Sequence, residues 1–254
     1  MMNIKKVSVN TALPGKARAR VLIIYTGGTF GMTYDREGVL VPFDFADILH
    51  ELPTLKNLAH EITAFSFATP IDSSNINIEH WQLIGKIIFD QYQHQDGFVV
   101  LHGTDTMAYT TSALSFMLEG LQKPVVFTGA QLPISEARSD AREHLITALD
   151  IASARKDGFA LVPEVSIYFD YELLRGNRSK KVESMQFDAF DSGNYPPLAK
   201  AGVKIDYNFS VIRSPKKVAS LQALTFMLAK RPKLLAKLLA HSNRSSTVNF
   251  DTIE

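Results

Sequence analysis

The fold is decided by residues 97–107, which read GFVVLHGTDTM. The apolar run before His102 is typical of a strand that is buried on both faces, as in a parallel sheet. A helix is expected to begin at Thr104 and Asp105, and ligands of such sheets sit beyond the carboxyl ends of the strands, beside helix N-termini. Thr and Asp are also common helix caps, so this pair alone predicts either a simple cap or a binding edge.

A second stretch repeats the pattern. Residues 21–32 read VLIIYTGGTFGM, a buried strand that is followed at once by a glycine pair. Glycines let the backbone turn sharply and approach a ligand closely, which places Thr29 on a turn at the carboxyl end of its strand. The alternative is a glycine-rich hinge with an incidental threonine. Two threonines in similar positions after two strands favour a shared site.

A third group of polar side chains follows a strand expected at residues 62–67. Asp72, Ser73 and Ser74 come just after it and before a helix expected at residues 79–93. One or two of these side chains are expected to cap that helix. A cap needs only one side chain. The others are then left to bind a ligand.

The remaining chain alternates strands and helices, which predicts a doubly wound, mostly parallel α/β sheet with helices on both faces and right-handed crossovers. Residues 1–20 are expected to be a loose polar arm. Further helices are expected at 45–52, 108–121 and 135–156, and further strands at 124–128, 165–169 and 203–207. The charged residues of the 135–156 helix are expected to form a solvated face.

Composition excludes several kinds of protein. The 254 residues are 46% hydrophobic and 21% charged, which is typical of a large soluble domain, alone or with a small appendage. The chain has no cysteine, which excludes a thiolate zinc site and a cysteine nucleophile. A formal charge of +1 gives no pull toward nucleic acid or an anionic membrane, and no apolar run is long enough for a signal peptide or a membrane span. A cytoplasmic enzyme or binding protein is expected.

Residues 213–254 differ from the rest. Between Tyr207 and Phe250 the chain has lysines and arginines but no Asp or Glu. Leucines at helical spacing predict two short amphipathic helices, separated at Pro232. Such a basic amphipathic segment can lie on a membrane, but helices that pack on the domain or on a neighbouring subunit are the simpler expectation.

The polar side chains expected at the sheet edge suit one chemistry. A threonine hydroxyl is a weak nucleophile that needs a nearby base, and an ammonium between a threonine and a carboxylate can relay its proton. The basic loop 175–181 is able to deliver Lys181 to Thr104 and Asp105 in this way. A carboxylate also suits the ammonium of an amino acid, and serines suit its carboxylate. The set predicts hydrolysis of an amide on an amino acid through a covalent threonine ester.

Two of these stretches resemble the signature motifs of the bacterial L-asparaginase family, YTGGTFGM at 25–32 and HGTDTM at 102–107. Shorter segments resemble its cytoplasmic type I branch. They are DSS at 72–74, FTGAQ at 127–131, RSD at 138–140 and RGNR at 175–178. The resemblance covers about residues 20–210 in order, so it is highly specific.

The resemblance implies a role for each side chain. Thr29 matches the nucleophile that forms the acyl-enzyme. Thr104, Asp105 and Lys181 match a second triad, which activates the attack or the water and also contacts the substrate, with Asp105 holding its ammonium. The segment that binds the α-groups of the substrate is matched by Asp72, Ser73 and Ser74. The implied reaction converts L-asparagine to L-aspartate and ammonia without cofactor or metal, and family members assemble as dimers or tetramers.

The chain departs from the family in two places. A tyrosine that assists the nucleophile in the family corresponds to Val39, and Tyr34 on the same loop is a hypothetical substitute. The second α/β domain of the family is mostly missing, and residues 218–245 resemble its two final helices, joined to the first domain as if by an internal deletion. The expected division is an arm at 1–20, an asparaginase-type α/β domain at 21–212 and a helical remnant at 213–254.

Three functions are compatible with these residues. The first is hydrolysis of asparagine, with activity reduced by the missing domain, and the intact catalytic positions favour it. The second is an inactive protein of this fold that binds an amino acid or a partner subunit. The third is hydrolysis of another amide, on glutamine or on a tRNA ester, although the near-neutral charge argues against tRNA.

Overall fold

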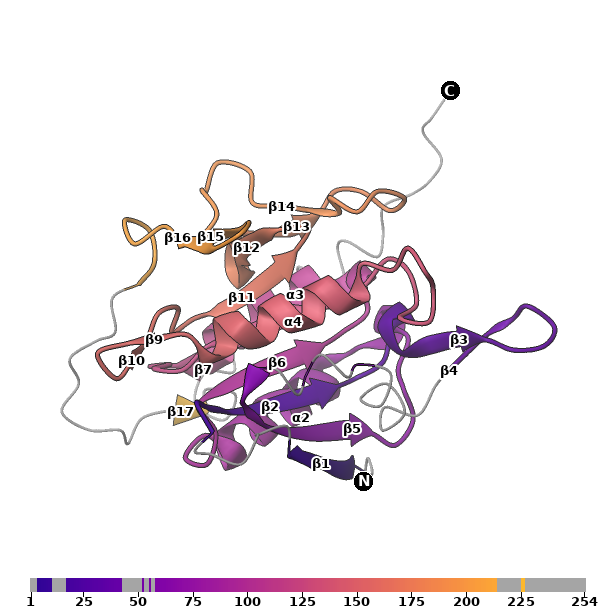
Figure 1. Ribbon diagram of the computed structural model, residues 1–254, viewed down its shortest axis with the longest axis horizontal. Coiled ribbons are helices and arrows are strands. Elements are labelled where there is room, and N and C mark those ends of the chain that lie inside the picture. Colours follow the sequence, from indigo (N-terminus) through magenta and orange to yellow (C-terminus); the bar gives the residue numbers. More distant parts are fainter. Residues whose placement is uncertain are drawn as a thin grey trace.

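A nine-stranded sheet runs through the described part of the molecule, with helices on both of its faces (Figure 1). The structure is a computed structural model that describes residues 4–10, 17–42, 52, 55, 58–213 and 225–226. From one edge to the other, the strands are β1 (Ile4–Asn10), β5 (Glu61–Phe67), β2 (Arg20–Tyr25), β6 (Gly97–Leu101), β8 (Val125–Thr128), β11 (Val165–Phe169), β12 (Glu172–Arg175), β15 (Ala199–Ala201) and β16 (Ile205–Tyr207).

The inner strands β5, β2, β6, β8 and β11 are parallel. Among them β2 comes first in the chain, β5 lies on one side of it, and every later inner strand lies on the other side. The order therefore reverses between β2 and β6, and ligands of doubly wound sheets bind at such a switch point. The predicted doubly wound, mostly parallel α/β fold is confirmed, and the antiparallel strands of the described sheet lie along its two edges.

Alternate residues of β2 pack into two different cores. Val21 and Ile23 belong to the core that includes the inner face of α4 (Ala141–Ser153). Leu22 and Ile24 belong to the core of α2 (Ile78–Gln91) and α3 (Thr104–Met117). Burying one such side chain stabilises a fold by about 1.5–3 kcal/mol. Helices on both faces thus explain a strand that is apolar at every position.

The elements expected around the sheet edge are confirmed, with bounds that differ by a few residues. The strands expected at 21–25, 62–67, 124–128, 165–169 and 203–207 are β2, β5, β8, β11 and β16. The apolar run before His102 is β6, and the helix expected at 79–93 is α2.

Residues 4–10 are a correction to the expected loose arm. They form β1, which pairs antiparallel with β5, from Ile4 opposite Phe67 to Asn10 opposite Glu61. The two adjacent lysines of this segment give it the appearance of a solvated arm. Charged side chains are nevertheless common on edge strands, where they discourage pairing with other chains.

Two helices also differ from the expectation. The helix expected at 135–156 is α4, which begins only at Ala141, because residues 135–140 form turns. After α4 the chain folds back through the short pair β9 (Arg155–Lys156) and β10 (Phe159–Ala160). The helix expected at 108–121 is α3, which starts at Thr104 and gives way to β7 (Leu118–Glu119).

Several short elements surround the carboxyl ends of the inner strands. The hairpin of β3 (Met32–Tyr34) and β4 (Leu40–Pro42) follows β2 and projects from the sheet (Figure 1). The pair β13 (Lys180–Lys181) and β14 (Phe190–Asp191) follows β12. The 3₁₀ turns η1 (Thr29–Gly31), η3 (Ser73–Asn75) and η4 (Gly176–Arg178) lie in the connections.

Some expectations fall largely outside the described residues. The helix expected at 45–52 lies outside them, apart from Leu52. The helices expected within 213–254 also lie outside them, apart from Arg213 and the pair Thr225 and Phe226. That pair forms β17, which is bonded to β7, so the helix prediction is wrong at these two positions. Within the described part, no helix is long and apolar enough to cross a bilayer.

Candidate active site

The loops after β2, β5 and β6 meet at the switch point. Gly28, with φ of 89°, lies so close to the β6 loop that an added Cβ would be 2.5 Å from the Cα of Gly103. Gly27, with φ of 132°, lies against the β5 loop, where an added Cβ would be 2.3 Å from the carbonyl oxygen of Ile71. Both dihedral angles and both contacts require glycine. The glycine pair therefore joins the three loops, and the alternative of an incidental hinge does not describe it.

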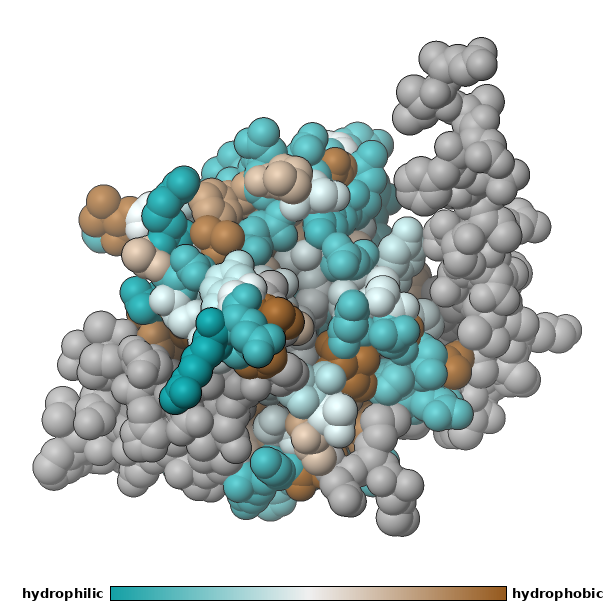
Figure 2. Space-filling view, turned by 90° about the vertical axis from the view of Figure 1, so that its right-hand side faces the viewer, coloured by the Kyte–Doolittle hydropathy of each residue, from teal (hydrophilic) through white to brown (hydrophobic). Residues whose placement is uncertain are grey.

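Thr104 and Asp105 are the first two residues of α3. The N-cap is Gly103, and no side chain caps the helix, so the simple capping role considered for this pair is wrong. A carboxylate in the first turn is favourable because the helix dipole is positive there. Figure 2 faces this edge of the sheet and shows that hydrophilic residues predominate on it. Asp105 is exposed and Thr104 is half-buried, so the pair can be reached by a polar ligand.

Lys181 joins this pair. Its Nζ donates to Thr104 Oγ1 at 2.8 Å and to Asp105 Oδ1 at 2.7 Å. The Lys181 side chain is 15% exposed, whereas that of Asp105 is 66% exposed. The structure thus brings Thr104, Asp105 and Lys181 together, with one ammonium shared between a hydroxyl and a carboxylate.

The route to Lys181 is fixed by contacts with the core. Arg175, at the end of β12, is buried and donates two hydrogen bonds to the Glu164 carboxylate, at 2.6 and 2.8 Å. The next turn, η4, is held to α3 because Thr111 Oγ1 donates to the Gly176 carbonyl oxygen at 3.1 Å. The run 175–181, expected to be a basic loop, therefore begins with a buried ion pair.

The segment Asp72–Ser74 lies beside the same loops. Ser73 is buried, its Oγ would lie 2.6 Å from a Cβ added at Gly103, and its carbonyl oxygen accepts from Thr106 Oγ1 at 2.7 Å. Asp72 is exposed and accepts from the Ser74 N–H at 2.9 Å. Ser74 is also exposed. The three side chains are therefore close to Thr104 but unequal in their access to a ligand.

None of these three residues caps α2, which corrects the expectation. The cap is Asn77, whose side-chain oxygen accepts from the N–H groups of Glu79 and His80 at 3.0 and 3.3 Å. In return, the His80 Nδ1 accepts from the Asn77 N–H at 3.1 Å. The groups of η3 are thus not used by the helix that follows.

Thr29 lies half-buried at the start of η1. The loop that carries Thr29 contacts the loop after β6 through Gly28. Within the described residues the Thr29 hydroxyl itself makes no hydrogen bond. Tyr34 and Val39 lie on the projecting hairpin and are 48% and 54% exposed (Figure 1). Among the described residues, no partner thus holds the Thr29 hydroxyl, and assistance from Tyr34 stays a hypothesis.

Comparison with known proteins agrees with this geometry. A family model described as "Asparaginase, N-terminal" matches residues 20–213. The chain belongs to the asparaginase family. L-asparaginase 1 of Escherichia coli (strain K12) is 42% identical over 189 residues, which are 73% of this chain and 54% of that protein.

Solved structures show the same asparaginase fold. The crystal structure of L-asparaginase I from Vibrio cholerae has a TM-score of 0.69 and 38% identity, covering 80% of this chain and 60% of that one. A probable cytoplasmic L-asparaginase from Campylobacter jejuni has a TM-score of 0.66 and 27% identity, covering 78% and 59%. This chain spans about half or less of the curated relatives it matches, from 37% to 54% of their length.

In this asparaginase domain, Gln131 is a site residue that the sequence reasoning missed. Thr104 Oγ1 donates a long hydrogen bond to Gln131 Oε1 at 3.4 Å. Gln131 Nε2 donates to the carbonyl oxygens of Ser184 and Gln186, at 3.1 and 2.8 Å. It thus connects Thr104 with the segment that follows Lys181. Its place just after β8, a fourth parallel strand ending at this edge beside β5, β2 and β6, is the signal that could have found it.

Asp140 is a second residue that was misread. Its carboxylate accepts from the N–H of Gln131 at 2.9 Å and from the N–H of Leu132 at 3.1 Å. Because this carboxylate holds the loop after β8, residues 135–140 fold back as turns, and α4 begins after them. Asp140 was expected on a solvated helix face, and it instead holds the backbone of Gln131.

His102 supports the Thr104 loop from the core side. Trp81 Nε1 donates to Thr110 Oγ1 at 3.0 Å, and Thr110 donates to His102 Nε2 at 2.9 Å. The His102 Nδ1 donates to the Gly103 carbonyl oxygen at 2.7 Å. Burial lowers the pKa of His102 to about 4, so the ring is neutral near pH 7 and keeps one donor and one acceptor.

The arrangement suits proton transfer between hydroxyl and ammonium groups. Lys181 donates to Thr104, and Thr104 donates to Gln131, so donors and acceptors form a continuous line. The exposed carboxylate of Asp105 is available to a cationic group of a ligand. Among the described residues, no group of three or more His, Asp or Glu side chains is placed to hold a metal ion.

Proposed function

We propose that this chain hydrolyses the side-chain amide of L-asparagine, giving L-aspartate and ammonia without a cofactor or metal. The proposal is carried by one observation, the hydrogen-bonded set of Lys181, Thr104 and Asp105 at the switch point of an asparaginase-family domain. L-asparaginase 1 of Escherichia coli and L-asparaginase I of Vibrio cholerae, to which the chain is similar, are named for asparagine, and these names support the choice of asparagine over glutamine. The proposal concerns the whole reaction, although the chain spans only part of its relatives.

Thr29 is the proposed nucleophile. Its hydroxyl oxygen adds to the amide carbon, the C–N bond breaks, and ammonia leaves with the hydroxyl proton, so that an ester remains on Thr29. Water then adds to the ester carbon, the C–O bond to Thr29 breaks, and Thr29 regains a proton as L-aspartate leaves. A covalent intermediate of this kind divides one difficult hydrolysis into two easier steps.

Thr104, Asp105 and Lys181 are proposed to move the protons. Lys181 Nζ and Thr104 Oγ1 are 2.8 Å apart, so a proton can pass between them as Thr104 takes a proton from the attacking hydroxyl or water. A positioned acid or base of this kind accelerates a reaction by about 10²–10⁴-fold. The exposed Asp105 carboxylate is proposed to hold the α-ammonium of the substrate.

Asp72, Ser73 and Ser74 are proposed to bind the α-groups of the substrate together with Asp105. Their turn is fixed against the loop of Thr104, because Thr106 donates to the Ser73 carbonyl oxygen. The exposed Ser74 hydroxyl can donate to the α-carboxylate, and the exposed Asp72 carboxylate can accept from the α-ammonium.

The assembly and location of the chain are further proposals. We propose a cytoplasmic homodimer or homotetramer whose partner is a small-molecule substrate, with no nucleic acid or membrane. One of the structural neighbours is described as a probable cytoplasmic L-asparaginase, which supports the location. The division into an arm at 1–20, an α/β domain at 21–212 and a remnant of a second domain at 213–254 also stays a prediction.

The proposal is tested by ammonia release from L-asparagine, with L-glutamine alongside and a Thr29→Ala variant as the control. We expect release from L-asparagine that is lost in the control, and slower release from L-glutamine. Equal release from both variants would refute the role of Thr29. No release from a folded chain would favour the other reading, an asparaginase-like protein that binds an amino acid or a partner subunit.

A further inference from the structure

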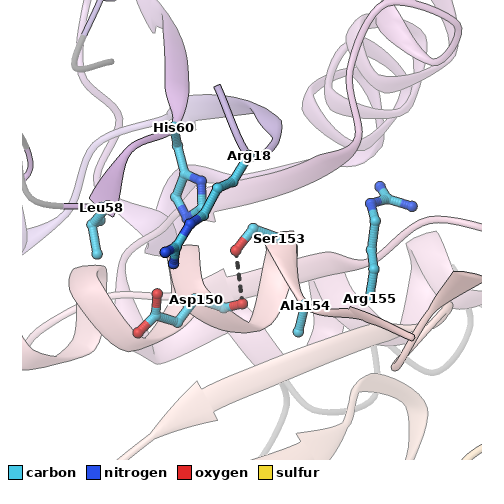
Figure 3. A pocket seen from close by; sticks show the side chains of 7 residues that line it. All are labelled: Arg18, Leu58, His60, Asp150, Ser153, Ala154 and Arg155. Carbon is cyan, nitrogen blue, oxygen red and sulfur yellow. Dashed lines mark hydrogen bonds between the residues drawn. The ribbon is translucent and has the colours of Figure 1, made fainter. Parts of the chain in front are cut away.

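A cavity of about 420 Å³ is lined by residues that come just before β2 and β5 and by the end of α4 (Figure 3). Arg18 lines it just before β2, and His60 lines it just before β5. Asp150 and Ser153 line it from the last turn of α4, and Arg155 from the first residue after that helix cap. It lies beside the amino-terminal ends of the same strands whose carboxyl ends carry the proposed active site, so the two are separate.

Two guanidinium groups and one carboxylate line this cavity. In Figure 3 the Arg18 side chain extends toward the Asp150 carboxylate, and Arg155 stands on the other side. Burial raises the pKa of Asp150, while the nearby His60 and Arg18 act to lower it. The two arginines, His60 and Asp150 thus form a polar cluster on the cavity wall, and within it His60 and Arg18 act on the charge of Asp150.

The cluster has an excess of positive charge. The Arg155 guanidinium lies 3.6 Å from the Asp96 carboxylate, and the Arg20 guanidinium lies 3.7 Å from the same carboxylate. The single negative charge of Asp96 is therefore shared between two guanidinium groups and does not neutralise both. His60 adds no charge near pH 7, because burial lowers its pKa below the ordinary value of 6.5. A ligand that matches this cavity carries one net negative charge.

We propose that the cavity binds a small acidic α-amino acid, which has two carboxylates and one ammonium. Guanidinium groups pair well with carboxylates, so Arg18 and Arg155 match the two carboxylates. The Asp150 carboxylate matches the ammonium. The volume lies within the range of about 300–1,000 Å³ that is usual for small-molecule sites.

L-aspartate has this chemistry and is the product of the proposed reaction. The choice of L-aspartate as the first probe rests on the proposed function, whereas the charge pattern of the cavity does not. The protein then has two sites for this molecule, one at each end of the sheet. The first involves Asp105, and the second involves Arg18 and Asp150.

The test is calorimetric titration of the full chain and its variants with L-aspartate. We expect one binding event to become about ten- to a hundredfold weaker in Arg18→Gln and in Asp150→Asn, because each loses a charge-assisted hydrogen bond. That event should persist in Asp105→Asn. Asp90→Asn, which changes another exposed helical aspartate on α2, is the matched control and should bind as the parent does.

Two simpler ligands test the chemical class. Succinate lacks the ammonium and L-alanine lacks the second carboxylate, so both should bind to the cavity more weakly than L-aspartate. Inorganic phosphate should also bind more weakly. The proposal is overturned if no L-aspartate event depends on Arg18 and Asp150, or if succinate or phosphate binds there as tightly. Loss of ammonia release with the cavity event intact would instead count against the proposed function alone.

Discussion

Replacing Lys181 by methionine is expected to remove most of the hydrolytic activity and leave the fold intact. The substitution keeps the length of the side chain and nearly all of its apolar stem. It removes the Nζ that donates to Thr104 at 2.8 Å and to Asp105 at 2.7 Å. The variant therefore separates the chemical role of the ammonium from its structural role.

The expected effect of Lys181→Met on kcat is larger than its expected effect on the free energy of unfolding. The Asp105 side chain is 66% exposed, so water screens its ion pair with Lys181, and pairs of this kind contribute about 0–1 kcal/mol to stability. If Nζ is the group that moves protons, its loss lowers kcat by about 10²–10⁴-fold. That loss corresponds to about 3–5 kcal/mol in the barrier. The kinetic effect should thus exceed the effect on the free energy of unfolding several-fold.

The matched control is Lys180→Met, the same substitution at the neighbouring position of β13, where the lysine is exposed. Ammonia release at saturating L-asparagine gives kcat, and urea denaturation gives the free energy of unfolding. We expect Lys180→Met to keep the parent values of both. The reasoning fails if Lys181→Met retains more than about a tenth of the parent kcat, since a lost proton-transfer group costs more than that. It also fails if Lys180→Met loses as much.

Three further predictions concern the surroundings of Thr104. Gln131→Met should lower kcat about tenfold with little change in KM, because a lost positioning contact raises the barrier by about 1.4 kcal/mol, and an unchanged kcat would contradict this. Stability should fall by up to about 3 kcal/mol between pH 6.5 and about 4, because the folded protein holds His102 with a pKa of about 4, below its ordinary 6.5. Between these pH values the unfolded chain binds a proton at His102 and the folded protein does not. The contribution of His102 to stability is therefore complete above pH 6.5 and is lost as the pH falls toward 4. The same urea curves should show a smaller pH dependence in His102→Asn. Gly28→Ala should destabilise the protein by more than about 1 kcal/mol, since the new Cβ would lie 2.5 Å from the Gly103 Cα at a φ of 89°, and a parent-like denaturation curve would exclude this contact.

The inner sheet could be predicted because each of its strands carries its own signal. β2 and β6 are apolar at nearly every position, and a strand with that pattern needs cover on both faces. Once the sheet is parallel, the carboxyl ends of its strands share one edge. The threonines that follow β2 and β6 therefore had to lie at the same edge, whatever the details of their loops.

Asp140 and Gln131 show what a periodic pattern cannot reveal. Asp140 lies in a run of mixed charges, which by composition is typical of a solvated helix face. Its actual partners are the backbone N–H groups of Gln131 and Leu132, on a loop that precedes it. A hydrogen bond of a side chain to a distant backbone leaves no trace in the spacing of apolar residues. The start of α4 and the role of Gln131 were missed for the same reason.

Lys181 could be suggested from the sequence, but the contacts that position it could not. A threonine and a carboxylate at a sheet edge form a proton relay when an ammonium lies between them, and the basic loop 175–181 can supply one. What holds it there is long-range: Arg175 is bonded to Glu164 in the core, and Thr111 on α3 holds the turn that follows. The two hydroxyl loops are fixed by backbone contact between glycines, whereas the ammonium depends on a buried ion pair. The same three loops can therefore persist without the ammonium, so under the proposed mechanism the position of Lys181, more than the presence of the threonines, separates an enzyme of this fold from a binding protein.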